Sequence, residues 1–276
     1  MAKQEDITAA AKHFYGEIQV EDRNKALSGD TGIVDHHFGV GEVDLTDLER
    51  MTDDQIMATI RRLEENQATR LIGCMGGVRS DDVVLDAGSG RGGTAFRLVQ
   101  ASGCRVEGIT IARYQADFAT EAAGRLGLAD KTHFSVMDML ALGYADNTFD
   151  HVFTNETTMY VVDLHELFAG FRRVLKPGGR YTLATWNINQ DYGDNPYVEP
   201  INDHYRVGMH TDLEYREALG MNGFRIVTDV DLTKQVIPHW EIRSRWSMAS
   251  GVEEYYLSGH KEKAILYKMM SAEVVK

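Results

Sequence analysis

Residues 83–93 read Val83-Val-Leu-Asp86-Ala-Gly88-Ser-Gly90-Arg-Gly92-Gly93, and this stretch decides the fold. A short apolar run that ends in an acid and opens into glycines is typical of a buried strand followed by a helix. The glycines let a ligand approach the backbone, because they carry no side chain that would exclude it. The glycine spacing by itself also fits a dinucleotide site, so the nature of the ligand depends on the rest of the chain.

Around this turn, short apolar runs alternate with segments of helical periodicity. The runs that predict strands are Val83–Leu85, Arg105–Ile109, His133–Val136, Phe149–Phe153, Arg180–Thr185, Phe224–Val230 and Ala264–Met270. Helical periodicity marks the segments Tyr114–Leu126, Leu164–Leu175, Thr211–Met221 and a stretch around Trp240–Tyr256. This alternation predicts a doubly wound α/β fold with a mostly parallel, seven-stranded sheet and helices on both of its faces.

Two regions outside this alternation suggest additions to the sheet. Residues 1–78 are predicted to be an N-terminal helical cap with a substrate-side loop, because apolar residues from Leu48 to Leu71 recur at helical spacing. Residues 79–186 then form the ligand-binding core, and residues 211–276 complete the core fold. The polar stretch 187–210 is too long for an ordinary connection, so we expect an inserted lid there.

The composition narrows the possible partners of this 276-residue chain. Its 42 acidic and 29 basic residues give a net charge of -13, which disfavours binding to nucleic acid or to an anionic membrane surface. The N-terminus has no apolar core of a signal peptide, and no run of 18 apolar residues occurs. We therefore expect a cytoplasmic protein without a membrane partner, and leave open whether it forms a homo-oligomer.

The spacing of Asp86, Gly88, Gly90 and Gly93 resembles motif I of the Rossmann-like methyltransferases that use S-adenosylmethionine. After the second strand, Thr110 stands where many members of this superfamily have an acid, and Gln115 follows. This variant resembles the sterol, cyclopropane fatty acid and isoprenoid carbon methyltransferases. The resemblance implies that the Gln115 amide reaches the ribose hydroxyls of the cofactor. The alternative interpretation of Gln115 is an exposed polar residue of a helix.

The resemblance extends to the ends of the third and fourth strands. Asp138 and Met139 match the adenine-binding position, although an exposed loop acid is the alternative for Asp138. Asn155 and Glu156 end the fourth strand at the carboxyl edge of the sheet, where ligands bind in such folds. A partly desolvated carboxylate there is suited to removing a proton from a carbocation. A hydrogen-bonded structural acid is the alternative for Glu156.

Several longer runs narrow the resemblance further. They are His36-His-Phe-Gly-Val-Gly41, Arg105-Val-Glu-Gly-Ile-Thr110, Gln115-Ala-Asp-Phe118, Asn155-Glu-Thr-Thr-Met-Tyr-Val161, Asp163-Leu-His165, Ile201-Asn-Asp-His-Tyr205 and Ile237-Pro-His-Trp-Glu-Ile-Arg243. Together with the glycine turn they resemble the geranyl diphosphate C-methyltransferases and their isoprenyl diphosphate relatives over most of the chain. The cofactor motifs are common to very many methyltransferases, whereas the His-His-Phe-Gly and Asn-Glu-Thr-Thr-Met-Tyr runs are much more specific.

This resemblance implies a C-methyltransferase in which Glu156 is the general base and Tyr205 stands where an aromatic ring, often Phe, faces the cation. Geranyl diphosphate is the preferred substrate, with farnesyl and isopentenyl diphosphates as close alternatives. The family's Mg2+ is expected to be held by the substrate diphosphate, without a direct protein ligand. Cavity walls are expected from Phe38, Tyr160, Trp186 and Trp240, and diphosphate contacts from His36, His37, Asn202, His204 and Arg243.

Two other functions fit parts of the same pattern. One is a natural-product O- or N-methyltransferase acting on a small molecule, which would not need Glu156 together with a metal-bound diphosphate. The other is a non-catalytic module that binds S-adenosylmethionine and serves a partner subunit. The glycine turn and the Asn155-Glu156 pair are both intact, and this weighs against the non-catalytic module.

Overall fold

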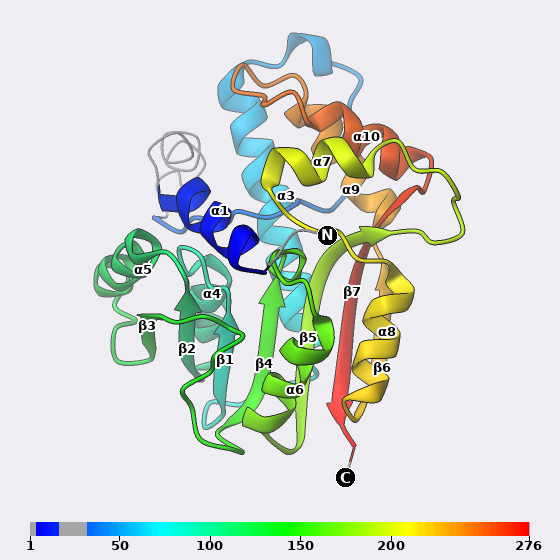
Figure 1. The fold of residues 1–276 in the computed structure, drawn as a ribbon. Coiled ribbons are helices and arrows are strands. Elements are labelled where there is room, and N and C mark those ends of the chain that lie inside the picture. Colours follow the sequence, from blue (N-terminus) through cyan, green and yellow to red (C-terminus); the bar gives the residue numbers. More distant parts are fainter. Residues whose placement is uncertain (1–3, 17–31, 276) are drawn as a thin grey trace.

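A seven-stranded sheet lies at the centre of the structure, a computed structural model that describes residues 4–16 and 32–275 (Figure 1). Its strands are β1 Val83–Ala87, β2 Arg105–Thr110, β3 Thr132–Val136, β4 Phe149–Asn155, β5 Leu175–Ile188, β6 Phe224–Asp231 and β7 Ile265–Val274. They are ordered β3-β2-β1-β4-β5-β7-β6. The pairs among β1 to β5 are parallel, whereas β7 is antiparallel to β5 and β6. The predicted α/β class and the mostly parallel sheet are confirmed.

Helices cover both faces of the sheet and bury an apolar core on each. One face carries α3 Asp53–Cys74, α4 Gly93–Ser102 and α5 Arg113–Leu126, and the other carries α6 Leu164–Val174 and α8 Asp212–Met221. Neighbouring strand residues point to opposite faces, so Val84 packs in the first core and Leu85 in the second. This arrangement explains why the strands read as continuous apolar runs, since both of their faces are covered.

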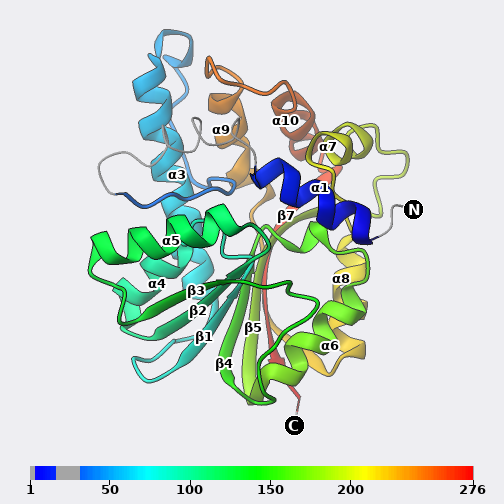
Figure 2. The same cartoon turned by 60° about the vertical axis from the view of Figure 1, so that its left-hand side comes forward.

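A second group of helices lies above the carboxyl ends of the parallel strands (Figures 1 and 2). It consists of α7 Val198–Tyr205, α9 Thr233–Arg243, α10 Glu253–Lys261 and the N-terminal half of α3. Its own small apolar cluster joins α3 to α9 and the turn beyond it, through Ile56, Ile60, Leu63, Ile242 and Trp246. We call this group the cap; it encloses the edge of the sheet at which Glu156 stands.

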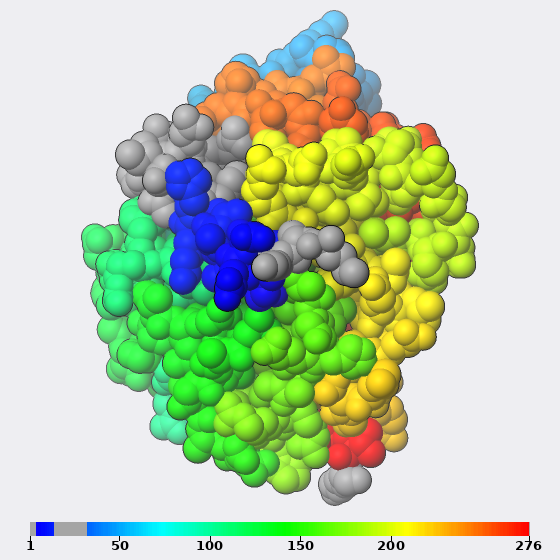
Figure 3. All heavy atoms as spheres, viewed as in Figure 1, coloured from blue at the N-terminus to red at the C-terminus, as the bar shows by residue number. Residues whose placement is uncertain are grey.

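Helix α1, Gln4–Gly16, lies across the same edge, on the face that also shows α7 (Figure 3). The Gln4 side chain fastens it, because its Nε2 donates to the Tyr160 carbonyl at 2.9 Å and its Oε1 accepts from Val162 N at 2.8 Å. The N-terminal helical segment predicted for residues 1–78 also includes residues 1–3 and 17–31, which lie outside the described residues.

Three element boundaries differ from the sequence predictions. Helix α3 begins at Asp53, because Thr52 caps it with Gln55, and residues 48–50 form a separate 3-10 helix, η2 Leu48–Arg50. The predicted helical stretch around Trp240–Tyr256 is wrong as a single element, since α9 ends at Arg243 and α10 begins at Glu253. Strand β5 runs to Ile188 through its pairing with β7, so only residues beyond it can form the lid.

Among the described helices, none has the length and apolar character needed to cross a membrane.

Candidate active site

A cavity that is partly open to solvent lies at the carboxyl edge of the sheet. Asp86, Thr110 and Asn155 line it from the ends of β1, β2 and β4. The predicted residues Gly88, Gly90, Gln115 and Met139 line it too. Parallel strands place their carboxyl ends together, so the structure brings these separate motifs to one site, as the fold rule predicts.

The glycine turn leaves room for a ligand beside the backbone. Gly90 has a φ of 52°, and a Cβ added there would meet no atom within 4 Å. Gly93 serves packing instead, because a Cβ there would lie 2.4 Å from the Val34 carbonyl oxygen. The turn therefore combines a glycine that faces the cavity with one that lets the loop before α3 approach α4.

The end of β2 holds a paired Thr and Gln. The Thr110 hydroxyl donates to Gln115 Oε1 at 2.6 Å and accepts from Ala112 N at 3.2 Å. Since Oε1 is engaged, the Gln115 Nε2 remains to donate to a ligand. Gln115 is buried, so the alternative of an exposed helical residue is wrong.

At the end of β3, Met139 lines the cavity, whereas Asp138 is not among the lining residues and accepts from Leu140 N at 2.9 Å.

Two polar groups that line this cavity are buried, the Ser89 hydroxyl and the Asp86 carboxylate. Ser89 Oγ has no hydrogen-bonding partner among the described residues. The Asp86 carboxylate is buried as well, and burial raises its pKa well above the usual value. Unsatisfied buried polar groups are costly, and a polar ligand that hydrogen-bonds to them offsets that cost. The cavity thus fits a ligand with hydroxyl and amine groups, such as S-adenosylmethionine.

A second, smaller cavity lies between the first one and the cap. Five aromatic side chains line it: the four predicted wall residues Phe38, Tyr160, Trp186 and Trp240, and Tyr205, which was predicted to face the cation. Phe38 is central, with ring centroids 4.5 Å from Trp240 and 5.7 Å from Trp186. Four residues line both cavities, namely His36, His37, Glu156 and Tyr160. The two spaces therefore meet at Glu156.

Glu156 is held so that one carboxylate oxygen stays available. Its Oε1 accepts from Phe38 N at 2.8 Å and from the Tyr267 hydroxyl at 2.6 Å, and no described group donates to Oε2. Its φ of 55° lies in the left-handed region, which is uncommon for a residue other than glycine and often marks a functional site. Burial raises the pKa of Glu156 to about 7, against the opposing effects of His37, Tyr267, Phe38 N and Arg243.

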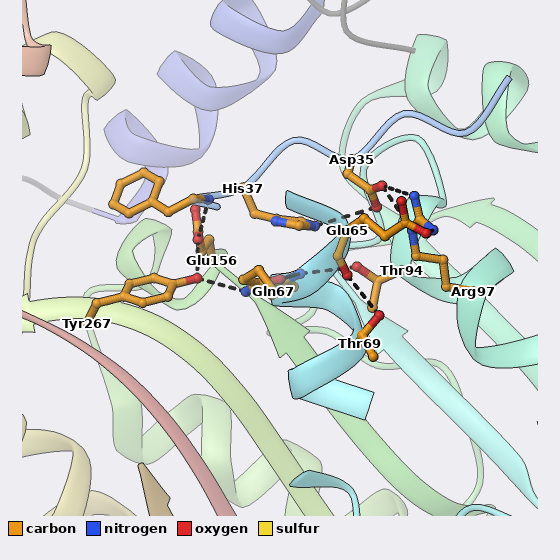
Figure 4. A network of polar contacts seen from close by, with 11 residues as sticks. Asp35, His37, Glu65, Gln67, Thr69, Thr94, Arg97, Glu156 and Tyr267 are labelled. Atoms are coloured by element: carbon orange, nitrogen blue, oxygen red, sulfur yellow. Dashed lines mark hydrogen bonds and ion pairs between the residues drawn. The ribbon is translucent and has the colours of Figure 1, made fainter. Parts of the chain in front are cut away.

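A carboxylate with such a pKa is matched to proton abstraction near neutral pH. It is anchored by a chain of polar contacts that crosses the site (Figure 4). Tyr267 OH accepts from Gln67 Nε2 at 2.7 Å, and the same nitrogen donates to Asn155 Oδ1 at 2.8 Å. Asn155 Nδ2 donates to Thr94 Oγ1 at 3.1 Å. Gln67 and Tyr267 were not predicted as site residues, although the polar Gln67 on the apolar stripe of a helix was a signal.

The expected diphosphate contacts separate into two groups. His36 is exposed and Arg243 is buried, and both line the second cavity. Arg243 Nε lies 3.6 Å from Glu253 Oε1 and has no hydrogen-bonding partner among the described residues. Asn202 and His204 do not line this cavity; Asn202 Oδ1 accepts from Met209 N at 3.1 Å, and the His204 ring packs against Tyr205. His37 is buried, unlike its neighbour His36.

Comparisons with known proteins agree with this geometry. A methyltransferase domain family matches residues 85–183. A geranyl diphosphate 2-C-methyltransferase of Streptomyces ambofaciens is 35% identical, with 98% of this chain and 96% of that protein covered. A geranyl diphosphate methyltransferase solved with geranyl diphosphate and sinefungin is 33% identical, with a TM-score of 0.93, covering 98% of this chain and 100% of that one. The Streptomyces coelicolor enzyme, solved with Mg2+, geranyl-S-thiolodiphosphate and S-adenosyl-L-homocysteine, is 33% identical, with a TM-score of 0.91 and 98% coverage of each chain.

The fold and the cavity at its carboxyl edge define an S-adenosylmethionine-dependent methyltransferase. The identity extends over almost the whole length of both chains, the cap included. The chain is therefore related to these enzymes beyond the methyltransferase core that many families share. The chain belongs to the geranyl diphosphate C-methyltransferase family.

Proposed function

We propose that this enzyme transfers the methyl group of S-adenosylmethionine to an alkene carbon of geranyl diphosphate. The observation that carries the proposal is the meeting of the cavity at the sheet edge and the aromatic cavity at Glu156. Family membership supports geranyl diphosphate as the substrate, since relatives of similar length are named for it.

The cavity at the sheet edge would hold the cofactor, which supplies an electrophilic methyl group when bound. Gly88 and Gly90 would admit its methionine part beside the backbone, and Asp86 and Asn155 would border it. Thr110 orients Gln115 so that the amide nitrogen can donate to the ribose hydroxyls. Met139 would contact the adenine, and Asp138 is proposed at the same position on the family resemblance alone.

The aromatic cavity would hold the prenyl chain, with the diphosphate toward its polar end. Within residues 4–16 and 32–275, no group of three His, Cys, Asp or Glu side chains is arranged to bind a metal ion. We therefore propose that Mg2+ is held by the diphosphate oxygens and neutralises part of their charge. Arg243 and His36 would contact the diphosphate directly, and Asn202 and His204 would do so only after a movement of α7.

The chemistry follows from the placement of Glu156 and Tyr205. The electron pair of the substrate double bond would form the new carbon–carbon bond to the methyl group, while the methyl–sulfur bond breaks with its electron pair left on sulfur. S-adenosylhomocysteine would be released, and a tertiary carbocation would remain on the prenyl chain. Tyr205, which lies in α7 and lines the aromatic cavity, would present its ring to that cation. Oε2 of Glu156 then takes a proton from a neighbouring carbon, whose C–H electron pair restores a double bond.

An assay over prenyl diphosphates of increasing length tests this proposal directly. Purified enzyme, labelled S-adenosylmethionine and Mg2+ would be incubated separately with isopentenyl, geranyl and farnesyl diphosphates. We expect the highest kcat/KM with geranyl diphosphate and a product one methyl group heavier. Transfer to none of the three would refute a prenyl diphosphate substrate, and preference for another chain length would correct the substrate while keeping the reaction.

The cellular setting is a further part of the proposal. An acidic surface with a net charge of -13 repels nucleic acid and anionic lipid headgroups. We propose that the enzyme acts in the cytoplasm on a dissolved substrate, without a nucleic-acid or membrane partner.

Removal of the metal should stop turnover. We expect excess chelator to suppress methylation of geranyl diphosphate and added Mg2+ to restore it, because the acidic protein otherwise repels a diphosphate. Binding of S-adenosylhomocysteine, measured by calorimetry, should be unchanged by the chelator and serves as the control. Full activity in excess chelator would contradict the bridging role and favour an O- or N-methyltransferase.

Tyr205 should act through its ring. Tyr205→Phe is expected to keep most of the activity, since the aromatic face is retained. Tyr205→Ala removes a cation–π interaction of about 0.5–2 kcal/mol, so kcat should fall by roughly 2- to 30-fold, or products should be diverted. Product analysis by mass spectrometry distinguishes these outcomes. An alanine variant with wild-type rate and products would exclude Tyr205 from cation stabilisation.

A further inference from the structure

Asp35 and His37 form a buried ionisable pair behind Glu156. Both lie in the loop that precedes α3, and their side chains are 5% and 4% exposed. His37 Nε2 is 3.6 Å from Asp35 Oδ1, and neither atom has a hydrogen-bonding partner among the described residues. His37 Nδ1 also has none. A buried imidazole with both nitrogens unsatisfied is destabilising, so its presence at the junction of two cavities calls for a functional explanation.

Asp35 is held in its charged form from the side away from His37. Its Oδ2 accepts from Arg97 Nη2 at 2.7 Å and Nε at 3.0 Å. Although burial opposes it, the nearby His37 ring and the Arg97 guanidinium lower the pKa of Asp35 to about 2. Asp35 is therefore a carboxylate at neutral pH. A carboxylate this close to a ring nitrogen stabilises a proton there.

Figure 4 shows the His37 ring between Asp35 and Glu156. Burial drives the pKa of Glu156 upward, and the charge of His37 is the largest effect that opposes burial. The other groups that face Glu156 are Arg243 from α9, Tyr267 from β7 and Glu64 from α3. Glu64 is a buried acid whose pKa is raised well above the usual value by desolvation. Buried His239 accepts from Gly39 N, and burial lowers its pKa well below the usual value, so it supplies no charge.

We propose that Asp35 and His37 are positioning residues: Asp35, fixed by Arg97, pairs with the His37 ring where the two cavities meet, and this buried pair supports Glu156 as the base. This rests on the proposed role of Glu156 as the base. It also separates the functions of the two adjacent histidines. The exposed His36 is left to contact the diphosphate, whereas the buried His37 acts through Glu156.

The test is the pH dependence of kcat with geranyl diphosphate, S-adenosylmethionine and Mg2+ at saturation. Asp35→Asn and His37→Gln remove charge with little change in shape. We expect both to move the midpoint of the acidic limb upward by about one pH unit, because either substitution breaks the Asp35–His37 pair and removes its support for the charged form of Glu156. At pH 7 kcat should fall by roughly fivefold, and it should recover toward the wild-type value at pH 9.

Glu65→Gln is the matched control. Glu65 accepts from Arg97 Nη1 at 2.8 Å, but its side chain is 56% exposed. Its loss should leave the midpoint unchanged. If His37→Gln does not fold, Asp35→Asn decides the question, since the Asn retains an oxygen that can accept from Arg97.

Several outcomes would overturn the inference. A uniform loss of kcat at every pH, with the wild-type midpoint, would make Asp35 and His37 structural. A raised KM for geranyl diphosphate with an unchanged kcat profile would make His37 a substrate contact. Glu156→Gln, measured in parallel, separates this inference from the proposed function. Wild-type turnover of that variant would refute the base itself, whereas an inactive Glu156→Gln with unshifted Asp35→Asn and His37→Gln profiles would refute only the positioning role.

Discussion

Glu156→Gln is expected to lower kcat by about 10²- to 10⁴-fold, which is the usual contribution of a positioned general base. The amide has nearly the shape of the carboxylate, and its oxygen can still accept from Phe38 N and the Tyr267 hydroxyl. It cannot take a proton from the methylated cation. Affinities for S-adenosylhomocysteine and geranyl diphosphate should therefore stay close to wild type, which calorimetric titration would measure.

An exposed glutamate supplies the control for this substitution. Glu166→Gln makes the same chemical change in the first turn of α6, outside both cavities, and should leave kcat unaltered. If Glu156→Gln instead methylated geranyl diphosphate at the wild-type rate, proton abstraction would have to be assigned to water or to a phosphate oxygen of the substrate.

Gly90→Leu is expected to abolish cofactor binding while the protein remains folded. A Cβ at Gly90 points into free space at the cavity, so the branched side chain would occupy the volume proposed for the methionine part of the cofactor. The left-handed φ of 52° adds a backbone cost of about 1–2 kcal/mol. Titration with S-adenosylhomocysteine should show no binding, and circular dichroism should show an intact fold.

Gly127→Leu separates the backbone cost from the loss of the site. Gly127 also has a left-handed φ, 68°, and open space around its Cβ position, but it ends α5 on the surface. That variant should show a comparable loss of thermal stability and normal cofactor affinity. Wild-type affinity in a folded Gly90→Leu protein would remove this glycine from the cofactor site.

Much of the fold could be predicted because its signals are local. Apolar runs bounded by helical periodicity identify the strands, and the acid followed by glycines after β1 identifies the turn that faces a ligand. Parallel strands end at a common edge, so the positions of Asp86, Thr110, Asn155 and Glu156 in the sequence were enough to place them together.

The prediction of a single helical stretch around Trp240–Tyr256 was wrong, and the reason is local as well. The Glu253 carboxylate accepts from Ser250 N and Gly251 N and starts a new helix, and periodicity does not detect such a cap.

The environment of Glu156 was decided only by the tertiary structure. Tyr267 comes from a strand 111 residues later, and Gln67, from the helix on the first face of the sheet, lies 200 residues from Tyr267. The burial that raises the pKa of Glu156 likewise requires the cap to close over the sheet edge. The sequence by itself determined which strand end carries the carboxylate, because strands and turns depend on neighbouring residues. Its hydrogen bonds and its affinity for a proton depend on which distant elements pack against it, and local periodicity carries no information about that packing.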